Sequence, residues 1–195
     1  MLFRSVEFAL LSSDAARSAY AQNNQLRAVT DLAPLCLHLV VTEASGIASI
    51  ADLKARRVSL GTAQESTYDL AMEIISAAGL ELKDLQRRNM SMGDSVDAMK
   101  NGELDAAFFL AVPGCEELAG LWDECSVRLI DITGDAASAV VGGREFETDE
   151  IPANTYSNQE NAVATVSTDL LLVCLATVPD KAIAEIRTAL DTSWN

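Results

Sequence analysis

Short apolar runs of strand length alternate with stretches of helical spacing along most of the chain. Helical spacing runs from Ser13 or Asp14 to about Gln22 and covers residues 66–78. It returns in "GDSVDAMKNG" and "PDKAIAEIRTALDTSW", with a single helical turn in "SIADLKA". Strand-like runs are "VEFALLS", "LRAVTDL", "LCLHLVV", "RRVSLG", "LDAAFFLAV", "SVRLIDI" and "AVATVSTDLLLVCLAT". The alternation predicts an α/β protein with mostly parallel sheets.

A loop-rich segment is predicted from Thr133 to about Asn161, because Gly, Asp, Asn and Pro accumulate there. Its acidic stretch "EFETDE" and the nearby "DITGD" lack the spacing of a calcium-binding loop, which favours a solvated acidic loop. The block "IPANTYSNQENAVATV" is unusually polar for a connection. Its Tyr156, Asn158 and Gln159 either donate hydrogen bonds into a cleft or serve the packing of the loop itself.

The helix predicted at 66–78 follows a strand and a polar turn in "VSLGTAQESTYDLAMEII". Its apolar side is formed by Leu70, Ala71, Ile74, Ile75 and Ala78. Gly79 then ends the helix as a left-handed residue does. In α/β folds, ligands bind at the carboxyl ends of strands, where helix N-termini point. The turn after the strand at 58–60 is therefore the first candidate binding site.

The start of this helix suits an acidic group of a ligand. Free backbone N–H groups and the positive end of the helix dipole favour a carboxylate or phosphate. Hydroxyls on Thr62, Ser66 and Thr67 can donate to such a group or cap the helix. The alternative is a capping box alone, formed by Thr62 with Glu65 or by Ser66 with Asp69.

The same turn is not a nucleotide-binding loop. Neither G-x-x-x-x-G-K-[ST] nor G-x-G-x-x-G occurs in the chain. Glu65 and Asp69 also compete with a phosphate for the helix dipole. A ligand that carries an ammonium group as well as a carboxylate suits these two residues better.

Composition and charge exclude several classes of protein. The chain has 195 residues, of which 49 % are hydrophobic and 22 % charged, as in a globular protein with a core. A net charge of −15 leaves no basic stripe for nucleic acid. No apolar run approaches the ~20 residues that span a bilayer. This acidity is typical of soluble secreted or periplasmic proteins, and many cytosolic proteins share it.

The chain shows no catalytic or metal-binding constellation. His38 is the only histidine and lies in the strand-like run "CLHLVV", so a buried structural role is predicted for it. No His/Cys cluster has zinc spacing, and neither a metal nor a cofactor is predicted. Cys36 and Cys174 are expected to be buried in strands. Cys115 and Cys125 flank the helical segment "CEELAGLWDEC" and are either free thiols or a disulfide.

Three blocks of the chain carry a resemblance to a known family. They are "GIASIADLKARRVSLG" with the polar turn and helix after it, "AMKNGELDAAFFLAVP", and "IPANTYSNQENAVATVSTDLLLV". The TAXI family of solute receptors for TRAP transporters reads "GI-S--DLKGK-V--G---SGT", "L--G--DA-F---G-P" and "IPAGTYPGQ-E---TV" in the same order. The chain resembles this family over nearly its whole length, above all in the last block.

The resemblance implies a type II periplasmic-binding-protein fold, in which crossing strands join two α/β lobes that close on a ligand. Residues 43–160 are then the second lobe, and residues 1–42 and 161–195 are parts of an incomplete first lobe. The implied function is binding of a small organic anion or amino acid, glutamate-like, in the periplasm. The implied partners are that solute and the membrane subunits of a TRAP transporter, with no bond made or broken.

The residues expected to bind the solute come from the polar turn, from two strand ends and from the last block. Phe109 is expected to form an apolar wall, Tyr156 and Gln159 to supply polar contacts, and Ser13 to contribute from the opposite lobe. The full set is Gly61, Thr62, Gln64, Glu65, Ser66, Thr67, Phe109, Tyr156, Gln159 and Ser13.

The chain departs from the family pattern at some of these positions. Where the family has Ser-Gly-Thr, this chain has "EST" from Glu65, which removes a glycine and adds a carboxylate. Asn154 and Asn158 stand where the family has glycines. The ligand therefore need not be the acidic solute, such as glutamate, with which the family is associated.

Two other functions share this fold, a ligand-sensing effector domain of a transcriptional regulator and an enzyme. The lone histidine and the lack of a spaced nucleophile–base pair disfavour the enzyme. The chain starts after the family's opening elements, stops before its last helices and shows no export signal, so we expect a fragment. Exposed strand edges of an incomplete lobe are expected to cause self-association.

Overall fold

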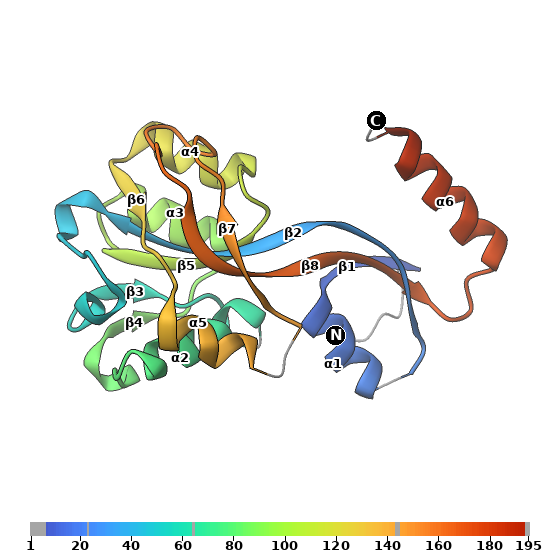
Figure 1. The fold of residues 1–195 in the computed structure, drawn as a ribbon, viewed down its shortest axis with the longest axis horizontal. Coiled ribbons are helices and arrows are strands. Elements are labelled where there is room, and N and C mark those ends of the chain that lie inside the picture. The colour runs from blue at the N-terminus through green and yellow to red at the C-terminus, as the bar shows by residue number, and fades with distance from the viewer. Residues whose placement is uncertain (1–6, 23, 64, 143–144, 194–195) are drawn as a thin grey trace. The chain divides into compact units, whose positions relative to one another are not determined.

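The computed structural model describes residues 7–22, 24–63, 65–142 and 145–193 (Figure 1). The chain forms two compact units, one of Met1–Pro34 with Thr168–Asn195 and one of Leu35–Ser167. Strands β2 (Leu26–Thr42) and β8 (Val163–Leu175) each run from one unit into the other, as crossing strands would. Residues 35–42 and 161–167 thus belong to the larger unit, and the interpretation of the two units as lobes stays a prediction.

The larger unit alternates strands and helices along the chain, and the predicted α/β class is confirmed. Besides parts of β2 and β8, its strands are β3 (Arg57–Ser59), β4 (Gln86–Arg88), β5 (Ala106–Ala111), β6 (Val127–Leu129) and β7 (Glu147–Ile151). Its α-helices are α2 (Ser66–Ala77), α3 (Met92–Lys100), α4 (Glu116–Glu124) and α5 (Gly134–Val141). Short 3-10 turns cover Glu43–Ser45, Ile50–Leu53 and Leu82–Asp84.

The strands of this unit form a mixed sheet in the order β8-β2-β5-β3-β4. Parallel pairing, as expected from strands joined through helices, is found between β3 and β5 and between β3 and β4. The crossing strands contribute antiparallel pairs, since β2 pairs with β5 and β6, and β7 pairs with β8. Because β3 and β5 are parallel neighbours, the loops that follow them leave the sheet at the same edge.

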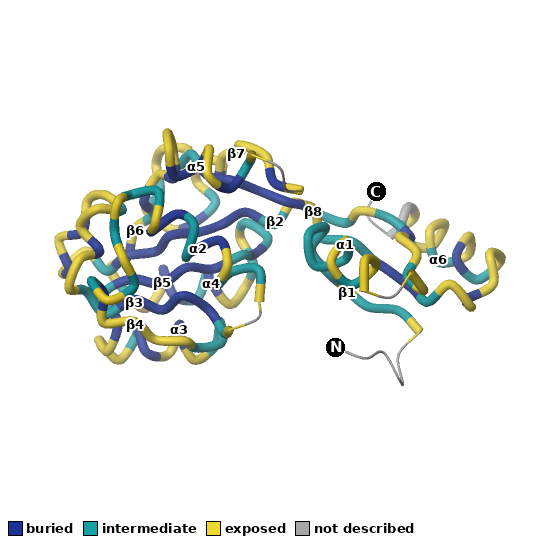
Figure 2. Tube along the Cα trace, turned by 90° about the horizontal axis from the view of Figure 1, so that it is seen from below, coloured by how far each residue is buried: buried dark blue, intermediate teal, exposed yellow. Residues whose placement is uncertain are grey.

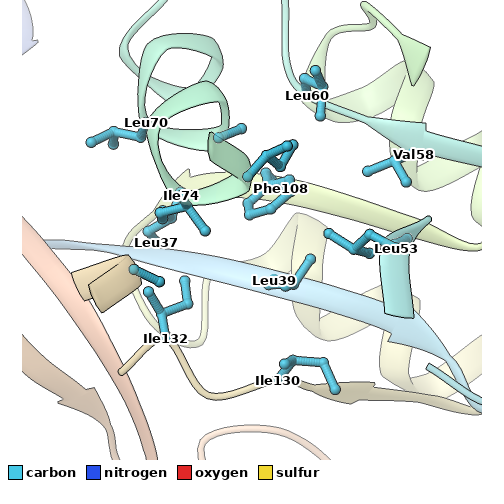
Figure 3. Close-up of a cluster of buried hydrophobic side chains, with 14 of the residues drawn as sticks. Leu37, Leu39, Leu53, Val58, Leu60, Leu70, Ile74, Phe108, Ile130 and Ile132 are labelled. Atoms are coloured by element: carbon cyan, nitrogen blue, oxygen red, sulfur yellow. The ribbon is translucent and has the colours of Figure 1, made fainter. Parts of the chain in front are cut away.

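Both faces of this sheet are covered by helices. Leu37 and Leu39 of β2 share a buried cluster with Leu70 and Ile74 of α2 (Figure 3). The alternate residue Val40 belongs to a second cluster with side chains of α3 and α4. In Figure 1, α2 and α5 accordingly lie on one side of the sheet, and α3 and α4 on the other. Burial on both faces explains why these strands read as nearly continuous apolar runs.

The prediction of a loop-rich segment from Thr133 to about Asn161 is wrong in part, because helix α5 and strand β7 lie within it. Helix α5 has only eight residues, mostly alanine, valine and other small side chains, so its apolar side is hard to recognise. Strand β7 buries Ile151 alone, and its acidic residues give no apolar alternation. The acidic stretch is therefore largely a strand, β7, rather than a solvated loop.

The runs "LRAVTDL" and "LCLHLVV", predicted as two strands, form a single strand, β2.

The smaller unit contains β1 (Phe8–Ser12), α1 (Ser13–Gln22), α6 (Asp180–Ser193) and the remaining parts of β2 and β8. Strand β1 pairs antiparallel with β8. The core of this unit is small, with Val29, Cys174, Val178 and Ile183 as its buried cluster. Helix α1 buries no residue, and Figure 2 shows the contrast with the buried strands of the larger unit. No helix among the described residues is long and apolar enough to cross a membrane.

Candidate functional site

The predicted binding turn lies between β3 and α2 and depends on Gly61. This glycine is buried and has a φ of +85°, a conformation that L side chains rarely adopt. A Cβ added to Gly61 would lie 3.0 Å from the Cβ and 3.1 Å from the Cγ2 of Thr67. The N–H of Glu65 donates to the carbonyl of Thr62 at 3.2 Å, which closes the turn. The backbone thus runs directly against the first turn of α2.

Helix α2 begins without a side-chain cap. Glu65 is the N-cap residue, and its side chain makes no cap hydrogen bond. Its carbonyl accepts from the N–H groups of Tyr68 at 3.0 Å and Asp69 at 3.4 Å. Neither of the predicted capping boxes is formed, because both require Thr62 or Ser66 at the N-cap position. The helix start therefore keeps its capacity to bind an anion.

Thr62 carries a buried polar atom that no described residue satisfies. Its Oγ1 is fully buried and has no hydrogen-bond partner, although the residue as a whole is partly exposed. A buried hydroxyl left without a partner costs about 1–3 kcal/mol. Glu65 beside it is exposed, while Ser66 and Thr67 are partly buried. Gln64, also predicted to bind the solute, lies outside the described residues.

Tyr156 belongs to a buried hydrogen-bond chain with the single histidine. Its hydroxyl is 2.8 Å from Nε2 of His38 and accepts the N–H of Gly114 at 3.1 Å. Nδ1 of His38 is 2.8 Å from the carbonyl oxygen of Cys36. The Tyr156 ring stacks on Trp122, with 4.1 Å between ring centroids and 14° between planes. Tyr156 is only 4 % exposed.

The hydrogen-bond partners fix which nitrogen of His38 carries the proton. A carbonyl oxygen only accepts, so Nδ1 donates to Cys36, and Nε2 of the neutral ring accepts from the Tyr156 hydroxyl. Burial lowers the pKa of His38 to about 4, against the raising effect of its backbone hydrogen bonds. Burial likewise raises the pKa of Tyr156 to about 12. The predicted buried role of His38 is confirmed, since its exposed fraction is 0 %.

Gln159 holds the loop that contains Tyr156. Its Nε2 donates to the carbonyls of Pro152 at 3.0 Å and Asn161 at 2.9 Å, and its Oε1 accepts the Tyr156 N–H at 3.2 Å. Asn154 and Asn158 both have a φ of +62°. Asparagine is among the few residues other than glycine that adopt this conformation readily, so the backbone here does not require glycine at either position. The side chain of Gln159 is thus engaged within its own loop.

The side chains of Phe109 and Ser13 are engaged in other contacts. Phe109 is 2 % exposed and belongs to the buried cluster that packs on α3 and α4. Ser13 is the first residue of α1 in the smaller unit, and its Oγ donates to the carbonyl of Asp169 at 3.4 Å. Of the predicted residues, the structure brings together those of the β3–α2 turn. It places Tyr156 and Gln159 in a second group, which also contains His38.

A hollow of about 510 Å³ lies elsewhere on the larger unit. It is bounded by the end of α4, strand β6 and residues 157–161. Gln159 is one of its lining residues, and Gly61 is not. Within the described ranges, no three His, Cys, Asp or Glu side chains converge on a metal-binding position. Sequence reasoning missed the pairing of His38 with Tyr156, and the only signal for it is a polar ring in an apolar strand.

Solved structures with a similar fold include a periplasmic binding protein. The chain is similar to the periplasmic aliphatic sulphonate binding protein SsuA from Escherichia coli, at 17 % identity and a TM-score of 0.54, over 97 % of this chain and 53 % of that one. It is also similar to an ABC transporter protein from Parabacteroides distasonis, at 15 % identity and a TM-score of 0.53, over 96 % and 54 %. An ancestral arginine-binding protein bound to arginine matches at 11 % identity and a TM-score of 0.51, over 96 % and 65 %.

These similarities confirm the predicted periplasmic-binding-protein fold. The chain spans about half the length of the first two structures that it matches. A family model, that of the NMT1-like family, matches residues 4–190. The chain therefore belongs to the NMT1-like family.

Proposed function

We propose that the chain is part of an extracytoplasmic solute receptor that binds a glutamate-like amino acid or small organic anion at the β3–α2 turn. The observation that carries this proposal is the buried Oγ1 of Thr62, which has no partner among the described residues, beside a helix start whose N-cap side chain, Glu65, makes no cap hydrogen bond. Such a helix start attracts a carboxylate through its N–H groups and dipole. The fold, shared with periplasmic binding proteins, supports the proposal.

The order of the three sequence blocks supports the finer assignment to the TAXI type of receptor. In this proposal the receptor works in the periplasm and delivers its solute to the membrane subunits of a TRAP transporter. Closure of two lobes retains the solute by shifting an equilibrium between open and closed states. The solute is released chemically unchanged, so no residue acts as an acid, base or nucleophile.

Acidic side chains at the turn favour a solute that also carries a positive group. Glu65 is exposed and makes no cap hydrogen bond, and Asp69 is exposed one turn further along α2. A bare dianion meets repulsion from these carboxylates, whereas an ammonium group is attracted by them. We therefore favour an α-amino acid, with its carboxylate at the helix start and its ammonium toward Glu65.

Binding is tested by thermal unfolding of the chain with L-glutamate, L-glutamine or succinate, because a ligand of the native state raises Tm. We expect an amino acid to raise Tm and to bind Thr62→Val about tenfold more weakly, since one hydrogen bond to a charged group is lost. Thr188→Val is the matched control, because that hydroxyl bonds only within α6. The proposal is overturned if none of the three compounds raises Tm, or if Thr62→Val binds as the wild type does.

A further inference from the structure

We propose that Tyr156 serves the solute site as a positioning residue, whose hydroxyl holds the backbone of Gly114 at the carboxyl edge of β5. The inference rests on the proposed function, because it concerns the same edge of the sheet as the Gly61 turn. This indirect role stands in place of the direct contact with the solute that the sequence predicts for Tyr156.

The Tyr156 hydroxyl cannot donate a hydrogen bond to a solute, because its proton is already used. Its proton goes to Nε2 of His38, because Nδ1 of that ring donates to Cys36. Its oxygen accepts the N–H of Gly114. The ring is stacked on Trp122 and is 4 % exposed. A solute group that accepted a hydrogen bond from this hydroxyl would have to displace His38 in a buried environment.

Gly114 is the residue on which this chain of hydrogen bonds ends. It has a φ of +77°, and a Cβ there would lie 3.6 Å from Cγ2 of Thr155, in the same loop as Tyr156. The next residue, Cys115, is the N-cap of α4. The Tyr156 hydroxyl therefore holds the backbone just before α4 starts, and His38 in β2 holds the hydroxyl.

The β5–α4 loop lies on the edge of the sheet that carries the candidate solute site. Ser59 of β3 is paired with Ala107 of β5 in parallel, so the chain leaves both strands toward the same edge. One strand leads to Gly61 and α2, and the other leads to Gly114 and α4 (Figure 1). A displacement of the Gly114 backbone is therefore expected to disturb the same edge of the sheet as the β3–α2 turn occupies. Binding sites lose affinity when the groups that surround them are not held in place.

The test compares Tyr156→Phe, which removes only the hydroxyl, with the wild-type chain. We expect amide exchange of the Gly114 N–H, followed by NMR, to become at least about tenfold faster, because its acceptor is gone. We expect L-glutamate to bind about three- to tenfold more weakly at a temperature where both chains are folded. The matched control is Thr165→Val, which removes the buried hydrogen bond from Thr165 to the Leu37 carbonyl in the same unit. The control is expected to lower Tm without changing either readout.

A second variant, His38→Gln, keeps one donor and one acceptor in the side chain and is expected to retain part of the Gly114 protection. The positioning role is overturned if Tyr156→Phe leaves either Gly114 exchange or L-glutamate affinity unchanged, or if Thr165→Val changes them equally. A wild-type chain that binds neither L-glutamate nor L-glutamine contradicts the proposed amino-acid ligand instead. In that case faster Gly114 exchange in Tyr156→Phe still supports the hydrogen-bond chain, and unchanged exchange rejects it.

Discussion

Arg57 contacts both carboxylate oxygens of Asp105, with Nη2 2.6 Å from Oδ1 and Nε 3.2 Å from Oδ2. The backbone N–H of Arg57 donates to Oδ2 as well, at 2.8 Å. Nη1 of Arg57 reaches the carbonyl of Gly102 at 2.7 Å. These bonds join the start of β3 to the start of β5, at the end of the strands opposite the candidate site. They fix the register of the two strands whose loops form that site.

Asp105→Asn is expected to lower the free energy of unfolding at pH 7 by about 1–2 kcal/mol, because charge-assisted hydrogen bonds are lost. Hydrogen bonds from Arg57 hold the pKa of Asp105 below its usual value. A lowered carboxyl pKa contributes stability above the unfolded-state pKa and loses it as the pH falls through the folded-state pKa. The difference between the two chains should therefore shrink below about pH 4. Urea unfolding at several pH values measures it, and an undiminished difference at pH 3 would contradict this assignment.

Gly61→Ala is expected to destabilise the chain more than Gly79→Ala. Both glycines have a positive φ, but a Cβ on Gly61 meets Thr67 at 3.0 Å, whereas a Cβ on Gly79 has nothing within 4 Å. The left-handed conformation alone costs about 1 kcal/mol for alanine, and the contact with Thr67 adds to it. Chemical denaturation of both variants measures the two losses. Equal losses of stability in the two variants would contradict the prediction, because the turn would then move away from α2 at no energetic cost.

Much of the larger unit could be predicted from the sequence, because its strands are buried on both faces and its helices have clear ends. Helix α2 begins at Ser66 and is followed by Gly79 with a φ of +76°, as the spacing indicates. Helix α5 and strand β7 were missed for the opposite reason. The small residues of α5 and the exposed acids of β7 leave no periodic pattern. The extended conformation of β7 is decided by its pairing with β8.

The candidate site was less predictable than the fold. The turn at Gly61 could be located, since a glycine between a strand and a helix has a local cause. The roles expected of Phe109, Tyr156 and Gln159 as ligand contacts depend on which way each side chain points, and spacing does not settle that. Phe109 is enclosed by helices α3 and α4, and the Tyr156 hydroxyl meets a histidine 118 residues away in the chain. Such long-range pairing leaves no local signal.

His38 should make the chain less stable in mild acid. Its pKa in the folded chain is about 4, against an ordinary value of 6.5, so the unfolded chain binds the extra proton first as the pH falls. Stability is therefore complete above about pH 6.5 and falls between there and about pH 4, by about 3 kcal/mol at most. The measurement is Tm against pH for the wild type and His38→Gln. The variant should lack most of the slope between pH 6.5 and 4.5, and an identical slope in both would contradict the neutral buried ring.

Cys115 and Cys125 are expected to stay reduced in the folded chain. They are the N-cap and C-cap of α4, so ten residues of helical rise, about 15 Å, separate their Cα atoms. A disulfide requires Cα atoms within about 7 Å, and both thiols are free in the structure. The folded chain is incubated with oxidised glutathione and then digested without reduction. Peptide mapping should show no bond between Cys115 and Cys125. A peptide cross-linked between the two would show that α4 unfolds.

The smaller unit is expected to cause self-association. Leu10 of β1 is 57 % exposed and Tyr20 of α1 is 52 % exposed. Strand β1 also stands at the end of the strand order among the described residues, and an open strand edge pairs readily with another chain. Light scattering after size-exclusion chromatography should show a mass that rises with concentration. The double variant Leu10→Gln/Tyr20→Gln should reduce this rise, since it removes apolar surface without altering the larger unit. A wild-type chain that remains a monomer at all concentrations and melts cooperatively would contradict the prediction, because the exposed side chains would then cause no association.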